Sequence, residues 1–341
     1  MCIFEKIFLL NLITAYGMLI SFAIQGYALY SIIFSTASIF VSYWFAASVL
    51  PLIRESNIHP ITKKYFYASL LFNVLSSLGP FSLAFMMVSH MANQDYLLGA
   101  VFYYLHFQYN GWFLFVIFGT LNEQIAQHTD NFEFKRNFNV LLIAAIMTLF
   151  LSVPWIDKQN MLGIVIFAIV IMQFLVFISF LRNTTEGNGP PLLLTDKIKI
   201  PLKRIVTFAI LIKGILQVLI LVPSLDQYAF GLRPVIIAYL HLVLIGVVSF
   251  YIFHYLIKER ILLMSKNLNK GLLIFLFGFI LNEIVLVLQG LSWLNIVGLP
   301  LTNETLFLAA ILMFVGLIVV TTSILKKDKN REVEVAEIDL S

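Results

Sequence analysis

Four ionisable residues lie inside stretches of this sequence that are otherwise apolar. They are His106 in YYLHFQYNGW, Lys213 in LIKGIL, His241 in AYLHLVLIG and Glu283 in FILNEIVLV, where Asn282 adjoins the glutamate. Imidazole, ammonium and carboxylate groups take up and release protons, and imidazole also binds metal ions. Ionisable side chains are costly in an apolar environment, so each of them indicates a partner or a function. We expect the four residues to converge on one interior cluster.

A structural explanation stands beside the functional one for each residue. A single intramembrane histidine is often a hydrogen-bonded packing residue. Lys213 and Glu283 carry opposite charges, which attract each other strongly at low dielectric, so these two residues can simply neutralise one another. The aromatic residues around His106, such as Tyr103 and Trp112, are typical of packing. Both explanations stay open at this stage.

The composition identifies the environment of these residues. Of the 341 residues, 60% are hydrophobic and only 12% are charged, and the mean hydropathy is +0.94. A soluble domain carries about twice that share of charge. Apolar runs of about 20 residues, the length a helix needs to cross a bilayer, recur along nearly the whole chain. The sequence therefore predicts an all-α polytopic membrane protein, a bundle of about ten transmembrane helices.

The distribution of Lys and Arg predicts how this bundle is oriented. With the N-terminus inside, Lys158 and Arg233 are the basic residues of the outer loops and Lys213 lies within a span, whereas the others lie on the inner face. This bias is the positive-inside rule, and it places both termini in the cytoplasm of a protein of the bacterial inner membrane. The predicted spans are 7–24, 29–52, 65–89, 97–121, 137–156, 160–181, 204–223, 233–256, 270–291 and 305–325.

The domain organisation is simple. Residues 1–325 are predicted to form a single transmembrane bundle with a cytoplasmic linker at about 183–203, and residues 326–341 a charged cytoplasmic tail without fixed structure. No internal repeat is strong enough to indicate duplication. The net charge of +4 comes from the inner loops, so it indicates contact with lipid headgroups and not with nucleic acid.

Several classes of site are excluded by what the sequence lacks. Cys2 is the single cysteine, which excludes an internal disulfide and any multi-cysteine metal site. Walker, dinucleotide-binding and HExxH patterns are absent. No motif marks a catalytic residue, so the sequence leaves enzymatic activity undecided.

The stretch around His106 resembles the sixth span of the catalytic subunits of haem–copper oxidases, above all the nitric oxide reductases. In that family a histidine that ligates the non-haem metal is followed four residues later by Glu and then by Gly. The same spacing here gives His106, Asn110 and Gly111. If this chain lacks the family's first two helices, its fourth span corresponds to the family's sixth, and the N-terminus stays inside.

The stretch AYLHLVLIGVVSF is similar to the tenth span of the same family. There a His-x-His pair ligates the two haems, and a glycine follows about five residues later. The pair here reads Tyr239-Leu240-His241, with Gly246 behind it. Only two of the six expected histidines are present, so the resemblance implies a reduced, ligand-poor relative and not a full oxygen or nitric oxide reductase.

The resemblance also implies a cofactor site. A haem or a copper ion would be held by His106 and His241 as metal ligands, with Tyr239 and Asn110 beside them in the cofactor-binding site. The resemblance also allows a chain that has lost its cofactors and serves in the assembly or sensing of a respiratory complex. Its partners would then be other membrane respiratory subunits as well as the lipid bilayer.

A rival function belongs to a different class of membrane protein. In a small transporter or channel, Lys213, Glu283, His106 and His241 would form a proton relay or substrate site near mid-membrane. A cofactor-free structural subunit is a third option. The metal site and the relay both require the two histidines, which we expect at a similar depth in the outer half of the membrane, to meet.

Overall fold

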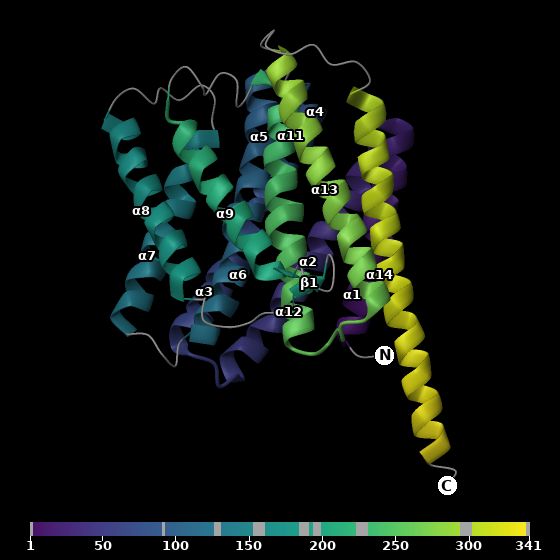
Figure 1. The fold of residues 1–341 in the computed structure, drawn as a ribbon. Helices are drawn as coiled ribbons and strands as arrows, with labels where there is room; N and C mark the ends of the chain where they lie inside the picture. The colour runs from purple at the N-terminus through teal and green to yellow at the C-terminus, as the bar shows by residue number, and fades with distance from the viewer. Residues whose placement is uncertain are drawn as a thin grey trace. The chain divides into compact units, whose positions relative to one another are not determined.

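The computed structural model is almost entirely helical (Figure 1), as the sequence predicts. It describes residues 3–90, 93–125, 131–152, 161–183, 191–193, 199–222, 231–293 and 302–338. The chain divides into two compact units, Met1–Thr184 and Thr185–Ser341. The boundary falls at the start of the predicted linker. A single bundle through residue 325 stays a prediction.

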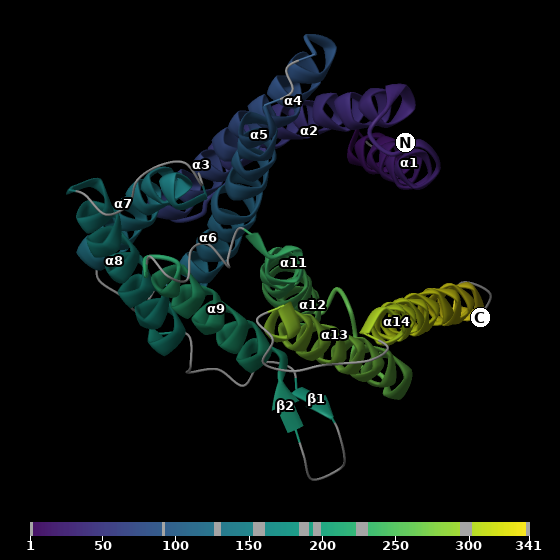
Figure 2. The same ribbon diagram turned by 90° about the horizontal axis from the view of Figure 1, so that it is seen from above.

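The first unit is built from helices packed side by side. In chain order these are α1 (Ile3–Gln25), α2 (Leu29–Glu55), α3 (Pro60–Ser76), α4 (Leu78–Val88), α5 (Gln94–His106), the π-helix η1 (Phe107–Phe113), α6 (Leu114–Ile125), α7 (Asn131–Met147), the 3₁₀-helix η2 (Thr148–Ser152) and α8 (Met161–Asn183). Helix α1 packs against α2, and α7 packs against α8 (Figure 2). Helix α3 packs against η1 and α6, which puts it beside the segment that follows His106.

The second unit adds a short strand pair to its helices. Its elements are β1 (Pro191–Leu193), β2 (Lys199–Pro201), α9 (Leu202–Leu219), α11 (Arg233–His241), the π-helix η3 (Leu242–Ser249), α12 (Phe250–Lys258), α13 (Lys266–Trp293) and α14 (Thr302–Ile338). Strands β1 and β2 pair antiparallel within the predicted linker. The Asn269 side chain ties β1 to α13, because it accepts a hydrogen bond from Leu193 N at 2.7 Å and donates one to Leu193 O at 2.6 Å.

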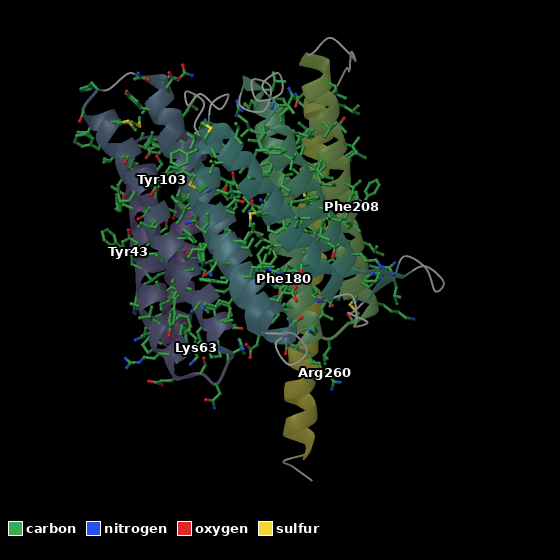
Figure 3. The ribbon with its side chains drawn as sticks, turned by 90° about the vertical axis from the view of Figure 1, so that its left-hand side faces the viewer. Tyr43, Lys63, Tyr103, Phe180, Phe208 and Arg260 are labelled. Atoms are coloured by element: carbon green, nitrogen blue, oxygen red, sulfur yellow. The ribbon has the colours of Figure 1, made fainter. Side chains whose placement is uncertain are left out.

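The outer surfaces of the helices are those of a membrane protein. Large apolar side chains point outward along the helices, as Phe208 does with 66% of its surface exposed (Figure 3). Seven helical stretches of the described residues are long and apolar enough to cross a membrane, namely Ile3–Gln25, Leu29–Glu55, Pro60–Val88, Met161–Phe180, Arg233–Lys258, Lys266–Ser292 and Thr302–Leu325. The protein is therefore an integral membrane protein, because in water so much exposed apolar surface would be covered.

The C-terminal tail differs from the expectation. The segment from residue 326 is predicted to lack fixed structure, but α14 continues through it to Ile338. The physical reason lies in its residue types. The segment LKKDKNREVEVAEI contains charged residues of both signs and neither glycine nor proline, so nothing in it ends the helix that begins at Thr302.

The two units share a central helix of the same construction. In the first unit α5 ends at His106 and continues as η1 and then α6; in the second unit α11 ends at His241 and continues as η3 and then α12. Both junctions carry the sequence Tyr-Leu-His, four further residues, and Gly. A π-helix inserts an extra residue into the helical turn, which redirects the side chains near it and often marks a functional site.

A second correspondence concerns the helix that packs on each π-helix. Helix α3 begins at Pro60 and packs on η1, and helix α9 follows Pro201 and packs on η3. Counted from its proline, every buried position of α9 is also buried in α3. The buried residues Leu202, Val206, Ala209, Ile210, Lys213, Gly214 and Gln217 match Ile61, Tyr65, Ala68, Ser69, Phe72, Asn73 and Ser76. The two histidines therefore occupy equivalent positions in two similar helix arrangements.

Candidate functional site

His106 is sealed inside the first unit. Its side chain is buried, with 1% of the residue's surface exposed. Its Nε2 lies 2.8 Å from the carbonyl oxygen of Ala145 on α7, and its Nδ1 lies 3.2 Å from the amide nitrogen of Asn110, one turn further along the helix. A carbonyl oxygen only accepts, so Nε2 carries the hydrogen and Nδ1 accepts from Asn110. Neither ring nitrogen has a lone pair left for a metal ion.

The polar residues that follow His106 extend this packing cluster. Gln108 donates hydrogen bonds to Ser76 Oγ at 2.7 Å and to Asn73 Oδ1 at 3.3 Å, both on α3. Asn110 is buried, and its Oδ1 has no hydrogen-bond partner among the described residues. The structural explanation for His106 therefore fits its surroundings. Sequence reasoning missed Asn73 and Ser76, although both stand out as polar residues within an apolar span.

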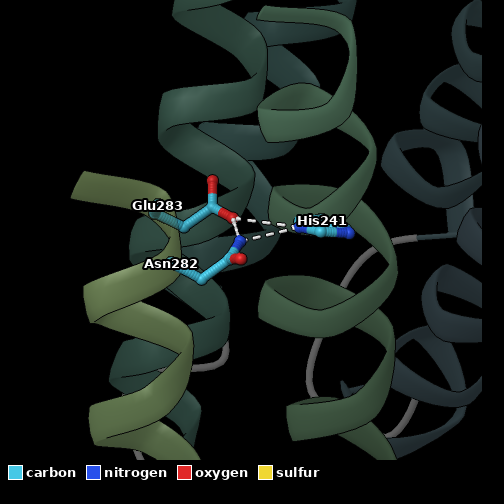
Figure 4. A network of polar contacts seen from close by, with 3 residues as sticks. All are labelled: His241, Asn282 and Glu283. Carbon is cyan, nitrogen blue, oxygen red and sulfur yellow. Dashed lines mark hydrogen bonds and ion pairs between the residues drawn. The ribbon is translucent and has the colours of Figure 1, made fainter. Parts of the chain in front are cut away.

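The second unit brings His241 together with two neighbouring residues of α13. Figure 4 shows the imidazole, the Asn282 amide and the Glu283 carboxylate converging on one point between α11 and α13. The Asn282 amide nitrogen lies 2.7 Å from His241 Nδ1 and 3.2 Å from Glu283 Oε1. His241 Nδ1 lies 3.8 Å from the same carboxylate oxygen. We call these three residues the His–Asn–Glu site.

Hydrogen bonding sets the protonation pattern of the His–Asn–Glu site. The Asn282 amide nitrogen has two hydrogens, and the geometry gives one to His241 Nδ1 and the other to Glu283 Oε1. In neutral His241 the ring hydrogen is therefore on Nε2, which has no hydrogen-bond partner among the described residues. The His241 side chain is 34% exposed and that of Glu283 18% exposed, so the site is open on the imidazole side.

The charge balance of the His–Asn–Glu site favours a proton. With Glu283 ionised and His241 neutral, the site carries a single negative charge inside an apolar span, which is costly. One added proton neutralises it, either on the carboxylate or on His241 Nδ1, where an imidazolium and a carboxylate would face each other across 3.8 Å. A proton on the carboxylate leaves the hydrogen bond from Asn282 to His241 in place, whereas a proton on Nδ1 requires the Asn282 amide to turn its oxygen toward the ring.

Lys213 and Tyr239 lie outside this group of contacts. Lys213 is fully buried in α9 and donates to Gln217 Oε1 at 2.6 Å, one turn further along the helix. The ion pair of Glu283 is with His241, so the alternative in which Lys213 neutralises Glu283 is not what the structure has. Tyr239 is half-buried on α11. The meeting of His106 with His241 concerns both units and stays a prediction.

Within the described residues, no group of three or more His, Cys, Asp or Glu side chains is placed to hold a metal ion. Haem or copper binding stays a prediction. Comparison with protein-family models, with curated proteins and with solved structures found no match. The site residues therefore have to be interpreted from their own chemistry.

Proposed function

We propose that this integral membrane protein is a small transporter or channel that moves protons through the His–Asn–Glu site. The observation that carries the proposal is the Asn282 amide, which donates to an imidazole at 2.7 Å and to a carboxylate at 3.2 Å within a membrane span. Two groups that exchange protons are thus linked by hydrogen bonds, and one of them is partly exposed. Intramembrane carboxylate and histidine residues are the usual components of proton relays.

The proposal narrows the relay to residues of the second unit. His106 is left out because both of its ring nitrogens are committed to Ala145 O and Asn110. Lys213 is left out because it donates to Gln217 and not to the carboxylate. The transporter class is also supported by the two similar helix arrangements, since internal structural repeats are common in transporter folds.

The topology is part of the proposal. We place ten spans in the membrane, with both termini in the cytoplasm and the protein in the bacterial inner membrane. The support is the concentration of Lys and Arg in the loops of one side. In this orientation α11 runs inward, and the exposed edge of His241 lies in the outer half of the membrane. Protons then enter the His–Asn–Glu site from the outer side.

Replacement of the carboxylate tests this function. In liposomes with an imposed pH gradient and an internal pH-sensitive dye, Glu283→Gln is expected to slow proton flux about a hundredfold, the usual cost of losing a positioned proton-transfer group. The amide retains the shape of the side chain but cannot take up the proton. The matched control is Glu304→Gln on α14, which removes an exposed carboxylate and is expected to leave flux unchanged. Equal flux in wild-type and Glu283→Gln liposomes would refute the proposal.

The second candidate function follows from the family resemblance. We propose a ligand-poor relative of the haem–copper oxidase catalytic subunits, in which His241 would hold a haem through its imidazole. The His241 side chain, which is 34% exposed, supports this, because a ligating imidazole has to be accessible. His241 does not fit a haem completely. Its Nδ1 accepts from Asn282, so the ring hydrogen is on Nε2, the nitrogen that would have to bind the iron. A copper ion held jointly by both histidines does not fit, because His106 has no free nitrogen.

Haem binding is tested by optical spectroscopy. If the second candidate is correct, protein purified from haem-replete cells shows a Soret band, which disappears in His241→Ala and persists in His90→Ala, a loop variant. Haem supplies electron-transfer chemistry, and the chain supplies the ligand and its orientation. Metal analysis of the same preparation measures copper. A wild-type preparation without a Soret band would rule out the haem function and leave the proton-transfer proposal standing.

A further inference from the structure

A second polar group lies at the inner end of the second unit, away from the His–Asn–Glu site. It consists of Lys203 in the first turn of α9, and of His254 and Lys258 one turn apart at the end of α12. Helices α9 and α12 pack against each other. His254 is 4% exposed, and its Nδ1 has no hydrogen-bond partner among the described residues. We call the three residues the basic cluster.

The three groups are close enough to influence one another. The charges of Lys258 and Lys203 both act on His254, and the charge of Lys258 acts on Lys203. In the described part of the chain, neither lysine forms a salt bridge. Glu259, in the turn after α12, also acts on Lys258 and offsets part of its charge. Among the described residues, the two ammonium groups are thus offset by one carboxylate, and the remaining excess of positive charge favours an added anion.

The start of α9 reinforces this preference. Its N-cap position is Pro201, and no side chain caps the free backbone N–H groups of the first turn. Helix N-termini carry a partial positive charge and bind phosphate and carboxylate groups. Arg204 follows Lys203 and is exposed. In the part of the chain that the structure describes, uncapped amides, two ammonium groups without a salt bridge and a buried imidazole with an unpartnered nitrogen thus occur at one end of a packed helix pair.

We propose that the basic cluster binds a phosphate group. The positive-inside orientation places it at the cytoplasmic interface, where anionic phospholipids expose their phosphates. The same chemistry would hold a free phosphate ion or the phosphate of a soluble compound. The inference does not depend on proton transfer or on haem binding, because it uses none of the residues of the His–Asn–Glu site.

The test uses the full-length chain in detergent and in mixed micelles. Native mass spectrometry measures retention of phosphatidylglycerol against phosphatidylcholine, and thermal unfolding in the presence of inorganic phosphate measures binding of the free ion. In Lys203→Gln/Lys258→Gln we expect about a tenfold or greater loss of affinity for the phosphate ligand. The matched control Lys266→Gln/Lys270→Gln removes two exposed lysines from the start of α13. It is expected to retain wild-type binding, as is Lys203→Arg/Lys258→Arg.

The outcomes distinguish lipid phosphate from free phosphate, and two of them would overturn the proposal. Retention of phosphatidylglycerol without stabilisation by inorganic phosphate assigns a lipid headgroup, and stabilisation by both assigns any phosphate ligand. If the double variant does not fold, the same binding measurements are made on Lys258→Gln alone, which removes an exposed side chain. Unchanged binding in Lys258→Gln and in the double variant, or an equal loss in the α13 control, would overturn the proposal.

Discussion

His106→Ala is expected to destabilise the protein by about 3 kcal/mol or more, in the range found when a large buried ring is removed from a packed core. The alanine would leave a cavity in the first unit. It would also remove the hydrogen-bond partners of Ala145 O and of the Asn110 amide, both of which are shielded from water. A buried polar group without a partner adds its own desolvation cost. The measurement is the unfolding temperature of the purified protein in detergent.

The matched comparison is His241→Ala. That side chain is 34% exposed and its Nε2 has no partner among the described residues, so its loss should change the unfolding temperature little while impairing proton transfer. We thus assign a structural role to His106 and a functional role to His241. A His106→Ala protein that is as stable as wild type, or a His241→Ala protein that is much less stable, would contradict this assignment.

Gly111→Ala is the second substitution with a large expected effect. A Cβ at this position would lie 2.6 Å from Phe72 Cβ and 2.7 Å from Phe72 Cγ. Those atoms sit next to the α3 backbone and cannot swing away, so α3 and η1 would have to move apart. Overpacking of this kind typically costs about 1–3 kcal/mol. Thermal unfolding in detergent, monitored by circular dichroism, measures the loss.

Two glycines provide graded controls for this substitution. Gly246→Ala meets the far end of the Phe279 ring at 2.9 Å, and a ring end can shift more easily than a Cβ. We therefore expect a smaller loss there. Gly231→Ala meets nothing within 4 Å and should be neutral. If Gly111→Ala unfolds at the same temperature as Gly231→Ala, the contact between α3 and η1 adapts to the added methyl group and the prediction is wrong.

The helices were predictable from the sequence, because a membrane requires long apolar runs and the chain contains them. Each predicted span overlaps a helix, and the breaks at Gly26 and before Pro60 follow local residue types. The π-helices were not predictable in this way. In each of them a glycine lies against a neighbouring helix, Gly111 against Phe72 of α3 and Gly246 against Phe279 of α13, and such contacts are a property of the packed structure.

The candidate site was only partly predictable. His241, Asn282 and Glu283 stood out because polar residues in an apolar span are rare, and the structure joins them. The partner of His106 is a backbone carbonyl, which every residue possesses, so no sequence pattern reveals Ala145. The recurrence of Tyr-Leu-His with a glycine five residues later was present in the sequence. Only the structure shows that both occurrences lie where an α-helix passes into a π-helix.

The correspondence between the two central helices bears on how such a motif is interpreted. The same short motif, Tyr-Leu-His with a glycine five residues later, occurs in two different surroundings. At His106 the imidazole is enclosed and supports the packing of its unit. At His241 the imidazole is partly exposed and has an acidic neighbour. The residues around the motif, and not the motif itself, thus decide whether its histidine is structural or available for chemistry.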